Sequence, residues 1–479
     1  MKPRYALRNQ PDRYRPSAVE PDAILNPLRS SVTAPAPRYY GGLLLLVFAY
    51  LCYARVHDAT NSFMLLRDQM RDWTIALGPL RSLPLTGTQS TAGGASLGPV
   101  YYWVLWISRV LIGPAVHNLP HAGAYGIAVL QGGADLLLFD TLRRRTGSMW
   151  VALAATLLGA TAPHELAVSS TIWNPAVSVA FVKYALAIRL RRDWEHSLWW
   201  TALATACAWL AVQAHSAAIF VAVPVAASYV VSDLLAYRLK RACEQTRAIV
   251  ETIVLLQVPF LVSALTQSGE VAPTRALGNA SDALATGLRW KPSLLALIEY
   301  VTQILFAPWI STIWIPVLAI GALIVLLRGR RDLPLLCSTL APLVLAVAGL
   351  AMWQGTYDSY WYLPLAPCAA VMLTIAATTW RPNLAGGLIV AALLVAQPAR
   401  LAESTRTYRM PQYGPVLRGT ERIVRQTMSL RSLTTSFQMP PFSDETYLFG
   451  ILGGQLTDAA EFDAVIDERG DVRFTPVTR

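Results

Sequence analysis

Charged residues are scarce in this chain. Only 14% of its 479 residues are Asp, Glu, Lys or Arg, against about 25% in soluble proteins. The hydrophobic share is 54% and the mean hydropathy is +0.40. The apolar residues form many separate runs, each near the roughly 20 residues that cross a bilayer as a helix. This composition excludes soluble, fibrous and disordered classes and predicts an all-α polytopic membrane protein.

Paired cysteines, a cleavable signal peptide and internal repeats are also lacking. The five cysteines are scattered singly without CxxC spacing, so neither a disulfide nor a thiolate metal site is predicted. The first apolar run starts near Tyr40 without a small-residue cleavage site, which favours a retained anchor. The missing repeat disfavours transporters built from two related halves.

The net charge of +11 would suggest nucleic acid in a soluble protein. Here the basic residues form five short clusters between apolar runs, as the positive-inside rule requires, so we predict no nucleic-acid partner. The clusters lie in the N-terminal tail and at 143–145, 189–192, 238–241 and 328–331. Together they predict about 11 crossings, at 40–56, 121–141, 149–163, 175–190, 198–212, 216–236, 248–266, 311–327, 333–351, 361–378 and 384–397.

This alternation predicts three parts: a basic cytoplasmic tail at 1–39, a transmembrane domain at 40–397 and an outer, soluble appendage at 398–479. The first outer loop is long, at 57–120, and a second loop is expected at 267–300. Within the first loop, the apolar segment 99–115 is interrupted by Arg109. A crossing there would invert every later cluster, so we predict an interfacial helix.

The stretch 61–77 carries the most chemistry. At helical spacing its apolar residues share one face, whereas Arg67, Asp68, Arg71 and Asp72 share the opposite one, which predicts an amphipathic helix on the outer membrane surface. Taken alone, these charges are more typical of surface ion pairs than of a site. A glycine-rich loop follows, and its Gly98-Pro99 junction is expected to start the interfacial helix.

Three further motifs lie at predicted outer ends of the crossings. Trp173-Asn174-Pro175 predicts a helix start with Asn174 as the N-cap and Pro175 at the first helical position. Gln213-Ala-His215 places a titratable group near the same surface. An aromatic turn contains Tyr360 and Tyr362. Each motif alone is compatible with an ordinary structural role.

The order of these motifs, however, resembles a known family. They occur as Asp68-Gln69-x-Arg71-Asp72, Pro84-Leu85-x-Gly87, Gly98-Pro99-x-Tyr101-Tyr102, Trp173-Asn174-Pro175 and Gln213-x-His215. This set resembles the bacterial branch of the GT-C glycosyltransferases, which are similar to protein O-mannosyltransferases and lipid A aminoarabinose transferases of glycosyltransferase family 39. The resemblance covers residues 40–235 and, more loosely, the chain to about 400.

The resemblance implies an inverting glycosyltransferase of the bacterial inner membrane. It would move a sugar from a polyprenyl-phosphate donor to a cell-envelope glycan, lipid or protein at the extracytoplasmic face. Asp68 matches the catalytic base, with Asp72 as the second candidate, and Arg71 matches the phosphate-binding residue. The remaining expected donor and carrier contacts are Gln69, Tyr101, Tyr102, Asn174, His215, Tyr360 and Tyr362.

Cofactor use is only partly defined by the sequence. No nucleotide cofactor is expected, because the activated sugar would arrive on a lipid. The family's frequent Asp-Glu pair is Asp68-Gln69 here, which leaves the use of a divalent metal open. Two other functions remain alternatives: a transporter or lipid flippase, and a non-catalytic membrane assembly partner.

Overall fold

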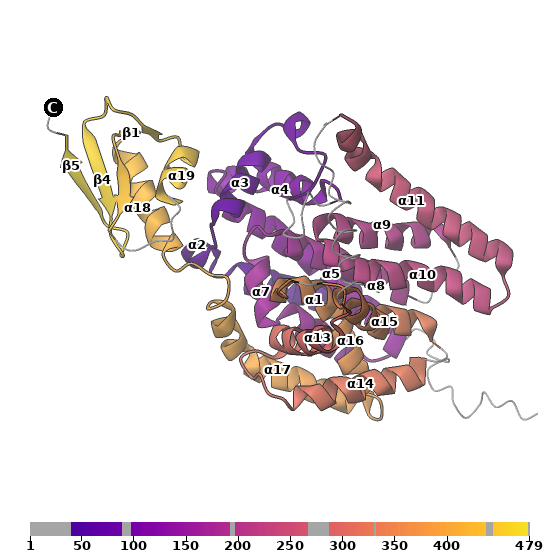
Figure 1. Cartoon of the computed structure of the whole chain (residues 1–479). Helices are drawn as coiled ribbons and strands as arrows, with labels where there is room; N and C mark the ends of the chain where they lie inside the picture. Colours follow the sequence, from indigo (N-terminus) through magenta and orange to yellow (C-terminus); the bar gives the residue numbers. More distant parts are fainter. Residues whose placement is uncertain are drawn as a thin grey trace, which may run out of the picture.

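The computed structural model describes residues 40–88, 97–191, 197–266, 287–329, 332–353, 355–436 and 444–477. The predicted tail at 1–39 and most of the expected loop at 267–300 lie outside these ranges. The described chain forms a helical bundle with a small α/β unit at one end (Figure 1).

The bundle runs from Tyr40 to Ser404. Its helices are α1 (Tyr40–Val56), α2 (Ala59–Ser62), α3 (Arg67–Leu77), η1 (Leu80–Ser82), α4 (Val100–Leu111), η2 (Gly113–Val116), α5 (His121–Thr146), α6 (Met149–Ala160), α7 (Pro163–Ser169), α8 (Asn174–Leu190), α9 (Leu198–Ala214), η4 (Ser216–Ala218), α10 (Ile219–Leu235), α11 (Leu239–Thr266), α13 (Trp290–Phe306), α14 (Trp314–Gly329), α15 (Leu333–Leu350), η5 (Ser359–Leu365), α16 (Ala366–Ala377) and α17 (Pro382–Ser404).

Within the described residues, seven of these helical segments are long and apolar enough to cross a membrane. Helices α6 and α7, which meet at a bend of 61°, pass the same test together. Helix α11 turns most of its apolar side chains outward, as a helix packed against lipid does. The predicted all-α polytopic class is thus confirmed, whereas the number of about 11 crossings stays a prediction.

Two predicted basic clusters meet at one end of the bundle. The Tyr40 hydroxyl at the start of α1 donates to Asp140 on α5 over 2.7 Å. The Arg191 guanidinium, just beyond α8, lies 2.9 Å from the same carboxylate. Arg145 donates to the Leu190 carbonyl over 2.7 Å. We call this the basic end and the opposite end, which carries α3 and α4, the site end. One end therefore gathers the start of α1 with the ends of α5 and α8, as the predicted alternation requires.

Helix α13 corrects the sequence prediction of a loop over 267–300. Its first residues lie at the site end, where the Arg289 amide donates to the Ala351 carbonyl just after α15 over 2.8 Å. Its last turn lies at the same end, because Arg400 of α17 bonds the carbonyls of both Leu305 and Thr161. Both ends of α13 therefore lie at the site end. The helix does not pass from one end of the bundle to the other, so the predicted alternation of the crossings is unchanged. Lys291 and Glu299 interrupt its apolar pattern, which concealed it in the sequence.

Helix α4 occupies the segment predicted to be interfacial. Its 12 residues span only about 18 Å, well short of the roughly 30 Å hydrocarbon layer. Tyr101, Tyr102 and Leu105 face the core, whereas Trp103 and Leu111 are exposed. These features agree with an interfacial helix, whereas its position on the outer side stays a prediction.

Four ionised side chains form a buried quartet inside the bundle. Arg55 of α1 lies 2.6 Å from Asp135 of α5 and 2.9 Å from Glu165 of α7. Lys183 of α8 lies 2.7 Å from Asp135 and also contacts Glu165. The two cations balance the two carboxylates, so charges that would be prohibitively costly alone join four helices.

The C-terminal unit begins after α17, which continues to Ser404, beyond the predicted boundary at 397. Its elements are α18 (Tyr413–Gln426), β1 (Ser429–Leu430), β2 (Leu433–Thr435), α19 (Asp444–Ile451), β3 (Gln455–Leu456), β4 (Phe462–Ile466) and β5 (Val472–Pro476). Strand β1 pairs in parallel with β3, and a second sheet has the order β2-β4-β5 with β2 and β4 parallel. Ile423, Leu430, Phe449 and Ile466 contribute to a separate hydrophobic core.

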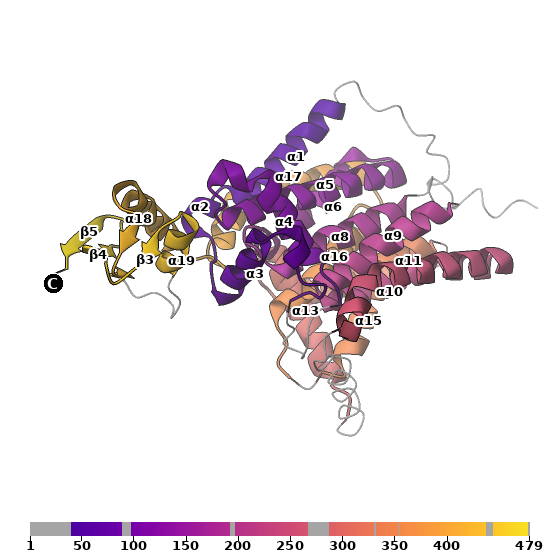
Figure 2. The same cartoon turned by 90° about the horizontal axis from the view of Figure 1, so that it is seen from above.

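This unit sits at the site end, beyond α2 and α3 (Figure 2). The Tyr447 hydroxyl of α19 donates to the Met70 carbonyl of α3 over 2.9 Å. The Tyr413 ring packs against Phe63 with centroids 5.2 Å apart. The C-terminal unit is therefore held directly against the helix that carries the predicted base.

Candidate functional site

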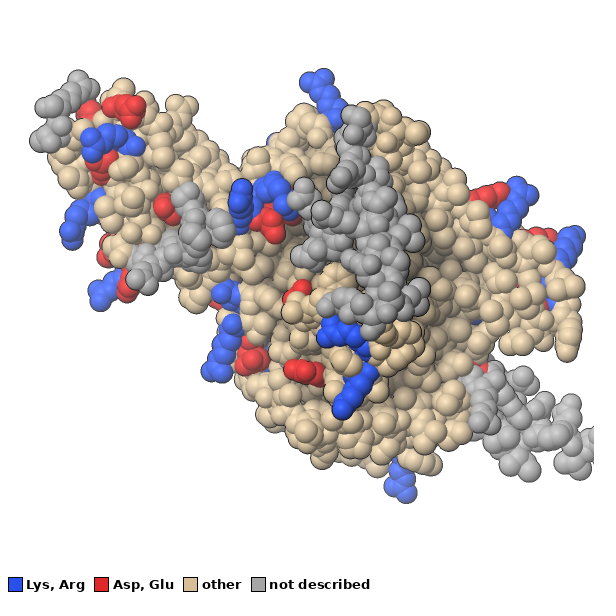
Figure 3. All heavy atoms as spheres, viewed as in Figure 1, with Lys and Arg blue, Asp and Glu red and all other residues tan. Residues whose placement is uncertain are grey.

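Helix α3 gathers two predicted site carboxylates, Asp68 and Asp72, around the guanidinium of Arg71. Arg71 Nη1 lies 3.0 Å from Asp68 Oδ1, while Nε and Nη2 lie 2.9 and 2.8 Å from Asp72 Oδ1. The Asp68 side chain is 72% exposed and that of Asp72 only 6%. Arg71 thus has one buried partner and one at the surface, and Figure 3 shows charges of both signs over this helix.

Asp72 corrects the predicted division of α3 into an apolar and a charged face. The buried residues are Gln69, Asp72, Trp73 and Ala76, so Asp72 faces inward. The Tyr102 hydroxyl of α4 donates to Asp72 Oδ1 over 3.1 Å. Burial raises the pKa of Asp72, although Arg71 and Tyr102 oppose that shift by stabilising the carboxylate. Binary patterning failed here because a carboxylate with two partners can be buried.

The Gln69 side chain caps the start of its own helix, α3. Its side-chain Oε1 accepts the Leu66 amide over 3.2 Å, which satisfies a backbone donor at the start of α3. This contact gives Gln69 a structural role, and its predicted contact with the carrier stays untested.

Helix α4 joins α3 to the Trp173 motif. Tyr101 and Tyr102 pack with ring centroids 5.4 Å apart, and the Tyr101 hydroxyl donates to the Ile172 carbonyl over 3.0 Å. The residue before Trp173 is therefore anchored beside the Asp72 cluster. This brings together two motifs that are about 100 positions apart in the sequence.

Asn174 differs from its predicted role. Trp173 occupies the N-cap position of α8, and Asn174 lies inside the helix without a capping bond. Its amide instead donates to the Ala214 carbonyl at the end of α9 over 2.8 Å. The side chain thus joins two helix ends, because the α9 carbonyl is an available acceptor once that helix stops.

Tyr360 lies between Trp173 and His215, close to the contact between the start of α8 and the end of α9. The Tyr360 ring centroid is 5.1 Å from that of Trp173 and 5.8 Å from that of His215. Tyr362 is buried and packs instead against Tyr300 of α13, with centroids 5.2 Å apart. The structure therefore brings Tyr360 to His215 and directs Tyr362 to a different neighbour.

Gly98 and Gln213, from two of the ordered motifs, pack on each other. A Cβ atom at Gly98 would lie only 2.3 Å from Gln213 Cδ, so a larger residue at position 98 would have to displace the Gln213 side chain. The Gln213 amide also donates to the Leu256 carbonyl of α11 over 2.7 Å. This pair fixes α4 against α9 and α11, a packing role for two of the ordered motifs.

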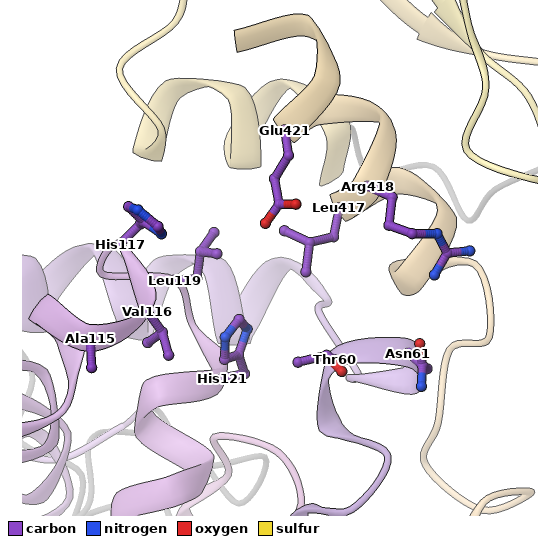
Figure 4. Close-up of a pocket in the computed structure, with 10 residues that line it drawn as sticks. All are labelled: Thr60, Asn61, Ala115, Val116, His117, Leu119, His121, Leu417, Arg418 and Glu421. Carbon is purple, nitrogen blue, oxygen red and sulfur yellow. The ribbon is translucent and has the colours of Figure 1, made fainter. Parts of the chain in front are cut away.

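A separate pocket of about 380 Å³ lies between the bundle and α18. Figure 4 shows His117, Leu119 and His121 below, with Leu417, Arg418 and Glu421 above. Thr60, Asn61, Ala115 and Val116 complete its lining. None of the predicted site residues borders it.

Comparison with known proteins identifies the architecture. No protein-family model and no curated protein sequence matches the chain. Its structure is similar to that of ArnT from Cupriavidus metallidurans in the apo state, with a TM-score of 0.55, 13% identity and coverage of 87% of this chain and 85% of ArnT. For ArnT bound to undecaprenyl phosphate, the TM-score is 0.57 and the identity is 15%, with coverage of 88% of this chain and 86% of ArnT.

The chain has a GT-C fold. The predicted resemblance is confirmed at the level of this fold. In this GT-C fold, the described residues contain no cluster of three or more His, Cys, Asp or Glu side chains arranged to hold a metal.

The sequence prediction missed two groups of side chains inside this GT-C fold. His164 and Tyr408 lie near Trp173, with centroids 5.8 Å apart from each other, and Tyr408 lies 5.1 Å from Trp173. Glu165 and Lys183 belong to the buried quartet. Charged residues inside apolar runs were an available signal for the quartet. Nothing in the sequence linked Tyr408 to residues that precede it by more than 200 positions.

Proposed function

We propose that the chain is a membrane glycosyltransferase that moves a sugar from a polyprenyl-phosphate donor to a cell-envelope acceptor. The observation that carries the proposal is the Asp68, Arg71 and Asp72 cluster at the site end of a GT-C fold. A protein with a similar fold has been solved with undecaprenyl phosphate. The site end would face the extracytoplasmic side of the bacterial inner membrane.

The proposed reaction needs one base and one cation. Asp68 takes the proton of an acceptor hydroxyl while the oxygen of that hydroxyl attacks the anomeric carbon. The bond from that carbon to the carrier phosphate breaks, the electron pair stays on the phosphate and the configuration inverts. Arg71 stabilises this leaving group by charge, and no proton donor is required.

The two carboxylates suit different roles in this reaction. Asp72 holds Arg71 through Nε and Nη2 and already accepts the Tyr102 hydroxyl. Asp68 has an exposed contact to Nη1 alone, and such surface pairs contribute little to stability. An arriving phosphate can therefore displace Asp68 from Nη1, which also frees the Asp68 carboxylate to act as the base.

Membrane carboxylates do not support the transporter alternative. Asp135 is neutralised in the buried quartet, and Asp140 is paired at the basic end. Glu299 is exposed on α13 at the site end. Among the described residues, these three acidic groups lie in separate places and do not form a continuous path, which a proton- or ion-coupled carrier would need.

Arg71→Ala should weaken undecaprenyl phosphate binding by about 10- to 100-fold. A hydrogen bond to a charged group contributes about 1.5–3 kcal/mol, and each 1.4 kcal/mol changes affinity tenfold. Titration of the purified protein in nanodiscs, followed by tryptophan fluorescence, measures this change. Arg67→Ala is the matched control, because Arg67 is an exposed arginine of the same helix. Equal affinities of the two variants would contradict the assignment of Arg71.

A further inference from the structure

An aromatic cluster surrounds Trp173 at the site end. Tyr360 and Tyr408 each lie 5.1 Å from the Trp173 ring, measured between centroids. His215 meets Tyr360 edge-on, and His164 meets Tyr408 edge-on, both at 5.8 Å. We call these five residues the Trp173 cluster. They come from five separate parts of the chain: α7, the start of α8, the end of α9, η5 and the segment after α17.

Both histidines of the Trp173 cluster have an unused nitrogen. His164 is 4% exposed and His215 is 7% exposed. The Nδ1 atom of each is buried and has no hydrogen-bond partner among the described residues. An unsatisfied buried polar atom is costly, so two in one cluster call for a polar ligand or bound water. Burial lowers the pKa of His215 to about 4, so its ring is neutral at pH 7 and can both donate and accept.

The three larger rings offer the complementary surface. Trp173, Tyr360 and Tyr408 are only half-buried, so each residue is partly exposed. Ligand sites typically combine aromatic walls with a few placed polar groups. A sugar ring matches this combination, because its C–H faces pack on aromatic rings and its hydroxyls bond imidazole nitrogens.

The Trp173 cluster is connected by contacts to the cluster of Asp68, Arg71 and Asp72 on α3. Tyr102 bonds Asp72, Tyr101 packs on Tyr102, and the Tyr101 hydroxyl holds the Ile172 carbonyl next to Trp173. We propose that the Trp173 cluster holds the sugar of the lipid-linked donor, with His164 and His215 bonding its hydroxyls. This inference rests on the proposed glycosyltransferase function.

The test compares sugar-bearing with bare carrier lipids. The probe is the polyprenyl-phosphate and polyprenyl-phosphate-sugar fraction extracted from the source cells after deletion of this gene. Purified protein in nanodiscs is incubated with this mixture, and mass spectrometry measures the ratio of sugar-bearing to bare carriers that it retains. His164→Phe and His215→Phe keep an aromatic ring and remove the nitrogens. His57→Phe is the control, because His57 bonds the Ala54 carbonyl outside the Trp173 cluster.

Wild-type protein and the His57→Phe control should enrich sugar-bearing carriers over the input mixture. Each cluster variant should lose about 3- to 10-fold of that enrichment, and the double variant more, while retention of bare carrier is unchanged. Undiminished enrichment in the double variant, or no enrichment by the wild type, would overturn the sugar subsite. Failure of the wild type to retain any polyprenyl phosphate would instead overturn the proposed function itself.

Discussion

Asp68→Asn should slow sugar transfer by about 10²- to 10⁴-fold, the usual contribution of a general base. The asparagine has nearly the same shape but cannot take the proton of the acceptor hydroxyl. Because the Asp68 side chain is 72% exposed, the substitution should leave folding intact. Carrier binding should also persist, since Asp72 still holds Arg71 through Nε and Nη2. The measurement is single-turnover transfer by purified protein, with lipid-linked donor and acceptor from the native envelope.

Two comparisons make this experiment specific. Asp458→Asn removes an exposed carboxylate from the C-terminal unit and should transfer sugar at the wild-type rate. Asp72→Asn removes the buried partner of Arg71, so its main effect should be weaker carrier binding, seen as a raised KM. Asp68→Asn protein that folds and transfers at nearly the wild-type rate would refute the base assignment. A rate collapse in Asp72→Asn at saturating donor would then assign the base to Asp72.

Lys183→Met should destabilise the bundle by about 3–5 kcal/mol, which is the usual cost of removing one partner from a buried ion pair. The substitution leaves Asp135 and Glu165 with Arg55 as their only cation in the buried quartet. Denaturant unfolding in detergent micelles measures the free energy of unfolding.

The matched control is Lys240→Met, because Lys240 is exposed near the basic end. Its stability should stay within about 0.5 kcal/mol of wild type. Lys183→Met combined with Glu165→Gln restores neutrality and should recover part of the loss. A cost below about 1 kcal/mol for Lys183→Met alone would show that the quartet does not stabilise the bundle.

The sequence predicted the parts of the fold that depend on hydropathy and on charge asymmetry. Apolar runs gave the crossing helices, and the meeting of Asp140 with Arg191 at one end agrees with the predicted alternation. Helix α13 lies at the site end and was missed because its apolar pattern is interrupted. Lys291 and Glu299 hide the helix from a hydropathy pattern.

The candidate site was predicted in outline, and its errors have a common cause. Helical periodicity assigned Asp72 to the solvent face, and capping preference assigned Asn174 to the N-cap. Both side chains instead satisfy partners from other elements, namely Tyr102 and the Ala214 carbonyl. Local sequence patterns predict burial from the polarity of each residue alone. A folded protein, however, buries a polar group wherever the tertiary structure supplies a hydrogen-bond partner. For the same reason no local pattern could bring Tyr408 to Trp173.

The most direct test of lipid-linked sugar transfer is made in the source cells. Mass spectrometry would compare envelope lipids and glycans in cells carrying the wild-type gene, no gene or the Asp68→Asn gene. A polyprenyl-phosphate-linked sugar should accumulate in the last two strains, while the same sugar disappears from an envelope glycan, lipid or protein. Identical lipid and glycan profiles in all three strains would contradict the proposed function.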